Sequence, residues 1–124
     1  MKIRIKGNSI RMRLTRSELE SFGKEGYLEE RTEFGDKIFI YALAVKTSGN
    51  ELSATFAGEK ITMYVPMQMV SEWTTTDKVG YDNVMAVGDG KSLSLLLEKD
   101  FKCIDDNVLE NQDDNYENPL TICE

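Results

Sequence analysis

The sequence contains no histidine and only two cysteines and two prolines in 124 residues. The lack of histidine removes the usual general base and the commonest neutral metal ligand, and it excludes catalytic sites of the Ser-His-Asp or Cys-His kind. No apolar run approaches the about 20 residues that a membrane-spanning helix needs. We therefore expect no membrane segment and no cofactor, and a binding module is favoured over an enzyme.

The N-terminal stretch, MKIRIKGNSIRMRL, alternates charged and apolar residues and lacks the continuous apolar region of a signal peptide. We therefore expect a cytoplasmic protein. Cys103 and Cys123 are both near the C-terminal end. Two cysteines in a cytosolic chain are more often free thiols than a disulfide, so free thiols are favoured here. The alternative is a bond that would join the tail to the end of the last strand.

Charge is distributed unevenly along the chain, whose net charge is −7. Residues 104–124 hold seven of the 22 acids and no Lys or Arg, which leaves 15 acids and 15 bases in residues 1–103. We expect a single domain over 1–103 and an acidic C-terminal tail over 104–124. The tail also holds Tyr116, Pro119, Leu120 and Ile122. These are either incidental apolar residues or part of a segment that adds to an exposed sheet edge.

Gly7-Asn8 separates two alternating runs, which is typical of a two-residue β-hairpin. With Lys6 opposite Ser9, the apolar residues of both strands share one face. A slip of one residue would destroy that agreement, so the pattern fixes the register. The opposite face then collects the basic residues of the hairpin, which are Lys2, Arg4, Lys6, Arg11 and Arg13.

A short helix is predicted directly after this hairpin. Thr15 and Glu18 have the spacing of a capping box, and the helix is expected to run to about Phe22 and to end at Gly23. Leu19 and Phe22 form its buried stripe. A strand over 27–34, a turn at 35–36 and a buried central strand over 37–46 follow.

The same pattern then restarts. Strands are predicted over 51–57 and 60–65, followed by a helix that begins at Pro66 and buries Val70 and Trp73, and by a hairpin over 84–98. We interpret this as an internal ββαββ duplication with units of about 1–49 and 50–102, and the alternative is two ββα units that resemble each other by chance in a small α+β protein. The predicted fold class is α+β, with an antiparallel, strongly curved or barrel-like sheet and two short helices.

Like charges opposite each other on a hairpin are destabilising, so the basic face needs compensation. Four explanations stay open. Solvent and the acids Glu29, Glu30 and Glu33 could suffice. The acidic tail could fold over the face. The face could bind a phosphate-bearing ligand, because guanidinium groups match phosphate oxygens. Finally, it could bind an anionic protein, whereas nucleic acid is disfavoured by the negative net charge and by the lack of aromatics in the basic run.

The repeated hairpin–helix pattern resembles the CYTH or triphosphate-tunnel architecture. That resemblance implies hydrolysis of a triphosphate or nucleotide with a divalent metal. It would require the basic face to point into a tunnel and some of Glu29, Glu30, Glu33 and Glu98 to converge on the metal. The chain departs from the family where its alternating acidic signature should stand, since it has Lys2-Ile-Arg-Ile-Lys6 there.

The opening MKIRIKGNSIRMRLTRSE and the stretch EKDFKC at 98–103 are similar to a small bacterial family of uncharacterised proteins. This resemblance implies no activity, substrate or site residue. Our expectation is a small cytosolic binding or protein-interaction module with an anion-complementary basic face. The alternatives are a tunnel-type phosphohydrolase or phosphate binder, and a structural subunit of a homo-oligomer that makes contact through an edge strand or the tail.

Overall fold

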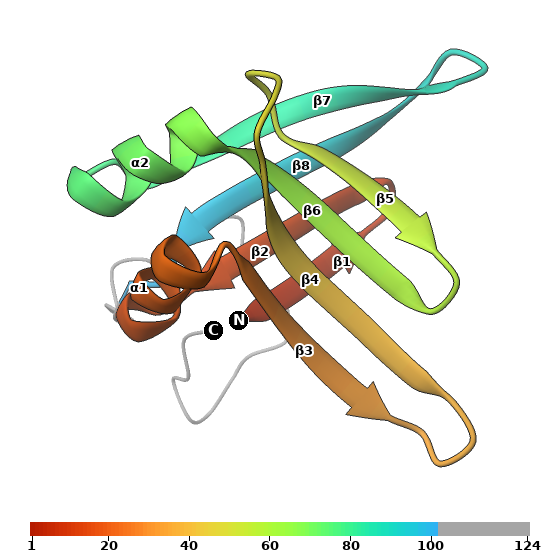
Figure 1. Ribbon diagram of the computed structural model, residues 1–124. Helices are drawn as coiled ribbons and strands as arrows, with labels where there is room; N and C mark the ends of the chain where they lie inside the picture. The colour runs from red at the N-terminus through yellow and green to blue at the C-terminus, as the bar shows by residue number, and fades with distance from the viewer. Residues whose placement is uncertain (102–124) are drawn as a thin grey trace, which may run out of the picture.

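The computed structural model describes residues 1–101 of the chain (Figure 1). Cys103, Cys123 and the predicted tail lie outside the described residues. The elements follow the predicted order of hairpin, helix and hairpin, used twice. They are β1 (Lys2–Lys6), β2 (Ser9–Leu14), α1 (Arg16–Glu25), β3 (Tyr27–Glu33), β4 (Ile38–Lys46), β5 (Ser53–Ala57), β6 (Lys60–Pro66), α2 (Met67–Thr75), β7 (Gly80–Gly88) and β8 (Lys91–Lys99).

The register of the first hairpin is confirmed. Ile5 lies opposite Ile10, Ile3 opposite Met12 and Arg4 opposite Arg11. Gly7 adopts a φ of 53°, in the left-handed region that this tight turn requires and that glycine enters at little cost.

The capping box that begins α1 is also confirmed, since the Thr15 hydroxyl accepts from the Glu18 amide and the Glu18 carboxylate accepts from the Thr15 amide. The predicted end at Gly23 is wrong, because α1 continues to Glu25 and ends at Gly26, where φ is 74°. Gly23 has another role. A Cβ atom at Gly23 would lie 3.1 Å from Cγ2 of Thr74, so the missing side chain allows α1 to pack closely against α2.

The strands form two four-stranded sheets, in the orders β1-β2-β8-β7 and β3-β4-β6-β5. The prediction of a fully antiparallel sheet is wrong, because β2 pairs parallel with β8 and β4 pairs parallel with β6. The barrel-like closure is wrong too, since the two sheets stay separate and open. The reason is topological. In each unit the helix leads the chain from one sheet to the other, so hairpins of different units meet along parallel central strands.

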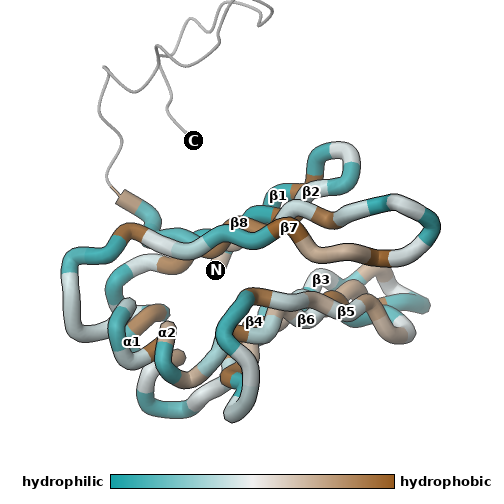
Figure 2. The backbone as a smooth tube through the Cα atoms, turned by 90° about the horizontal axis from the view of Figure 1, so that it is seen from above, coloured by the Kyte–Doolittle hydropathy of each residue, from teal (hydrophilic) through white to brown (hydrophobic). Residues whose placement is uncertain are grey.

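The apolar faces of the two sheets enclose the core with the help of both helices. Figure 2 shows the sheets as two layers with α1 and α2 at the same end. Phe22 of α1 and Trp73 of α2 are fully buried, as predicted, and the Trp73 indole N–H donates to the Val79 carbonyl at 3.1 Å. Neither helix of residues 1–101 is long and apolar enough to cross a bilayer.

Candidate functional site

The first hairpin turns its basic side chains away from the core. Ile10 and Met12 are buried between the layers and Ile3 packs against them. Because successive strand residues point to opposite faces, the residues between them lie on the outer face of the β1-β2-β8-β7 sheet. We call this outer set the basic hairpin face, made of Lys2, Arg4, Lys6, Arg11 and Arg13.

The acids that the sequence suggested as partners are engaged elsewhere. β3 lies in the other sheet, where the Glu29 carboxylate contacts Arg31 Nε at 2.8 Å and Lys60 Nζ at 3.8 Å. Glu30 binds the N-terminal ammonium group at 2.9 Å. Among residues 1–101, neither of them nor Glu33 forms an ion pair with the basic hairpin face. This pairing, which was one of the open explanations, is therefore not found within residues 1–101, because the two elements belong to different layers.

Two acids at the end of β8 take that role instead. The parallel register places Glu98 beside Arg13, and the Glu98 carboxylate lies 2.7 Å from Arg13 Nε and 3.7 Å from Arg11 Nε. The Asp100 carboxylate lies 3.4 Å from Lys2 Nζ. The Glu98 side chain is only 19% exposed, so its bond to Arg13 is shielded from solvent and is stronger than an ordinary surface pair.

Arg4 and Lys6 form no ion pair within residues 1–101, and both are exposed. Arg4 also lies directly opposite Arg11, an arrangement that is destabilising unless an anion is near. Within residues 1–101 the five bases have only Glu98 and Asp100 as ion-pair partners, so they exceed their paired acids by three charges. The excess is concentrated toward the hairpin turn and along β1, an edge strand.

The geometry that a triphosphate tunnel requires is not present in the described part of the chain. The basic hairpin face points outward, and Glu98 is on this face whereas Glu29 and Glu30 belong to the other sheet. Within residues 1–101, no three Asp, Glu, Cys or His side chains gather in a way that could hold a metal ion. The structure of residues 1–101 therefore does not support a triphosphate tunnel.

The N-terminal ammonium group ties the start of β1 to both layers. It binds the carboxylates of Glu18 and Glu30, and the Met1 carbonyl accepts from the Tyr41 hydroxyl at 2.8 Å. Burial disfavours the charged amine, but its hydrogen bonds to the two carboxylates outweigh burial and raise its pKa above 8.0. Burial likewise opposes the charge of Glu18, yet the ammonium group and the Thr15 amide lower its pKa below 4.5. Sequence reasoning missed this network, because it joins residues that are distant in sequence.

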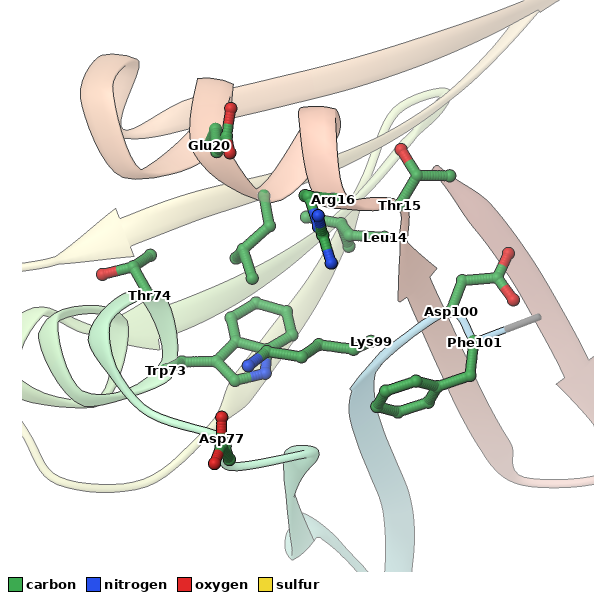
Figure 3. A pocket seen from close by; sticks show the side chains of 11 residues that line it. Leu14, Thr15, Arg16, Glu20, Trp73, Thr74, Asp77, Lys99, Asp100 and Phe101 are labelled. Carbon is green, nitrogen blue, oxygen red and sulfur yellow. The ribbon is translucent and has the colours of Figure 1, made fainter.

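A pocket of about 680 Å³ lies between α1, α2 and the end of β8 (Figure 3). Its floor consists of the buried side chains of Leu14, Leu19 and Trp73. Phe101, which is exposed, stands at its margin, and Lys99 extends from β8 toward Trp73 and donates to the Thr76 carbonyl at 2.9 Å. The other lining residues are Thr15, Arg16, Glu20, Thr74, Asp77 and Asp100. The rim carries charges of both signs, so it selects no single class of ion. Asp100 also pairs with Lys2 and so links the pocket to the basic hairpin face.

Comparison with known protein families gives a match over residues 1–120 to DUF7009, a family of unknown function. The chain belongs to DUF7009. No curated protein and no solved structure matches the chain significantly. The DUF7009 match includes the basic hairpin, both helices and all but the last four residues of the acidic C-terminal stretch.

The basic hairpin face of this DUF7009 protein was visible in the sequence because it depends on one hairpin. Its acidic partners were not, because Glu98 and Asp100 reach it only through the pairing of β2 with β8 across more than half of the chain. The one signal in the sequence was that Glu98 and Asp100 are the last acids before the tail.

Proposed function

We propose that this DUF7009 protein is an interaction module that binds an extended acidic segment of another protein along β1. The observation that carries the proposal is the outward basic hairpin face, in which Arg4 and Lys6 form no ion pair within residues 1–101. A buried or paired set of bases would need no partner, whereas exposed like charges opposite each other gain from one.

The spacing of the bases favours a peptide over a single phosphate group. Lys2, Arg4 and Lys6 alternate along β1, so neighbouring basic side chains are about 7 Å apart and the outer two about 13 Å apart. One phosphate cannot reach all three. The alternate carboxylates of an extended acidic chain repeat at the same distance.

The position of β1 supplies a mode of binding. β1 is the edge of its sheet, so its outward backbone groups are available to an added strand. A partner strand would place its carboxylates beside the three bases of β1. On the inner face, an apolar residue of that strand would cover Ile5, which is 52% exposed although it lies opposite the buried Ile10.

A homo-oligomer that pairs β1 with β1 of a second copy is disfavoured by charge. Such a pairing would place the alternating bases of the two strands side by side, and like charges on neighbouring strands repel. Homo-oligomerisation through the other edge strands is left as an outcome of the test below.

We also infer that residues 1–103 form one domain that arose by duplication of a ββαββ unit. Two observations support this. Both units have the same order of elements, and each supplies its first hairpin to one sheet and its second hairpin to the other. Phe56 of the second unit corresponds to Ile5 of the first, because each lies two residues before its turn, opposite a buried isoleucine.

The experiment is a binding titration of the full chain with a short fluorescent peptide of alternating glutamate and threonine, followed by anisotropy. We expect binding that weakens as salt is raised. Arg4→Gln with Lys6→Gln should bind about twofold to thirtyfold more weakly, since each of the two exposed ion pairs contributes about 0.2–1 kcal/mol.

The matched control is Lys24→Gln with Lys46→Gln, which removes two exposed bases from other elements and should leave the affinity unchanged. Equal weakening by both double variants would show that only net charge matters. Preferential binding of inorganic tripolyphosphate or single-stranded DNA over the peptide would show that the natural partner is one of those ligands and not an acidic protein. Self-association that blocks the peptide would favour the homo-oligomer.

A further inference from the structure

We propose that the acidic C-terminal stretch, residues 104–124, binds the basic hairpin face of its own chain and competes there with the external partner. This inference rests on the function proposed above, because it assigns the regulation of that same surface. The stretch would act as an intramolecular competitor that mimics the acidic segment of the partner.

The first support is complementary charge. Residues 104–124 carry seven acids and no base, whereas residues 1–103 are balanced at 15 acids and 15 bases. Within the described residues, the five bases of the basic hairpin face exceed their two paired acids by three charges.

The second support is the path of the chain. β8 runs parallel to β2 and beside it, so the chain reaches the Lys2 end of the basic hairpin face at Asp100. Glu98 and Asp100 already place carboxylates on Arg13 and Lys2. The bases at the Lys2 end are thus paired with acids among the last described residues. Arg4 and Lys6, which are nearer the turn, form no ion pair within residues 1–101.

The third support is reach. From Lys2 to Lys6 the strand covers about 13 Å. Asp105 and Asp106 follow Asp100 by five and six residues, and an extended chain of that length spans about 16–21 Å. Glu98 is level with Lys2, so Asp100 lies about 7 Å beyond Lys2 and two strands away from β1. This puts Arg4 about 16 Å and Lys6 about 22 Å from Asp100. An extended segment that turns back along β1 therefore brings both acids to Arg4, and the length of the lysine side chain lets Lys6 meet Asp106. The short connection also gives them an effective concentration of about millimolar order, which favours the intramolecular contact.

The fourth support is that this stretch belongs to the family sequence. The DUF7009 match continues to residue 120, and six of the seven acids lie before that point. The basic hairpin and the acidic stretch therefore occur within one family unit, as an internal contact requires.

The contact is tested directly by carbodiimide cross-linking of the full chain, which joins a carboxylate to a lysine only where they touch. We expect products between Lys6 and the 105–106 acids that form at every protein concentration and disappear at high salt. Products that join two chains and increase with concentration, or products with Lys24 and Lys46 at equal yield, would overturn the inference.

The competition is tested with Asp105→Asn plus Asp106→Asn, and the matched control is Asp36→Asn plus Glu59→Gln, which neutralises two exposed acids in other turns. At low salt the first variant should bind the glutamate–threonine peptide about threefold to tenfold more tightly than the natural chain, and the control should not differ from it. If both bind like the natural chain, the inference fails and the proposed function stands. If no variant binds the peptide although the Lys6 cross-links form, the proposed function fails and the internal contact stands.

Discussion

Replacement of Glu98 by glutamine is expected to weaken folding and to strengthen anion binding at the same time. The Glu98 carboxylate accepts from Arg13 Nε at 2.7 Å and lies 3.7 Å from Arg11 Nε, and its side chain is 19% exposed. A hydrogen bond between charged groups contributes about 1.5–3 kcal/mol, and the longer, more exposed contact adds less than about 1 kcal/mol. We therefore expect Glu98→Gln to lower the free energy of unfolding by about 1.5–3 kcal/mol.

The same change frees two bases. With the carboxylate gone, the excess charge of the basic hairpin face rises by one, and Arg11 and Arg13 can turn to an external anion. The glutamate–threonine peptide should then bind several-fold more tightly at low salt, with a steeper dependence on salt. Stability is measured by urea unfolding and affinity by anisotropy on the same preparation.

Glu29→Gln is the matched control. Glu29 also bridges two bases, Arg31 and Lys60, but it does so in the other sheet and on an exposed surface. We expect a smaller loss of stability and no change in peptide affinity. An unchanged urea midpoint for Glu98→Gln, or a loss of peptide affinity in that variant, would refute the assignment of Glu98 as the acid that neutralises the basic hairpin face.

Three further predictions concern the fold. Gly23→Ala should stabilise the protein more in a Thr74→Ser background than in the natural chain. The higher helix propensity of alanine stabilises by about 1 kcal/mol, but in the natural chain the new Cβ would lie 3.1 Å from the Thr74 methyl group, which serine lacks. Equal effects in thermal unfolding would contradict this packing. The Met1 ammonium contribution to stability should be complete below pH 8.0 and be lost as pH rises through its raised pKa, and that of Glu18 should be complete above pH 4.5 and be lost as pH falls through its lowered pKa. Urea midpoints measured across pH check both contributions. In Glu18→Gln, the loss of stability at high pH and the loss at low pH should both be smaller. Trp73→Ala should cost about 3–5 kcal/mol, because the side chain is fully buried; a midpoint close to the natural one would show that the indole is not part of the core.

Local features of the fold could be predicted from the sequence. The register of the first hairpin follows from one turn and two alternating runs, and the start of α1 follows from the spacing of Thr15 and Glu18. Both depend on residues within a few positions of each other, so no knowledge of the rest of the chain was needed.

Features set by distant contacts could not be predicted. Gly23 resembles a helix terminator in the sequence, but its role is to admit Thr74 of α2, which is a tertiary contact. The parallel pairs β2–β8 and β4–β6 join strands of different units, and an alternating pattern carries no information about which strand lies next to it. For the same reason the partners of the basic hairpin face were sought on β3 and are found at the end of β8 and directly after it.

The proposed function requires that β1 offers its basic edge to an acidic strand. The most direct measurement is an NMR titration of the isotopically labelled full chain with the glutamate–threonine peptide at low salt. We expect the amide signals of Lys2–Lys6 to shift most, and Arg4→Gln with Lys6→Gln to need a severalfold higher peptide concentration for the same shifts. Shifts confined to α1, α2 and Phe101 around the pocket, with β1 unchanged, would contradict the proposed function.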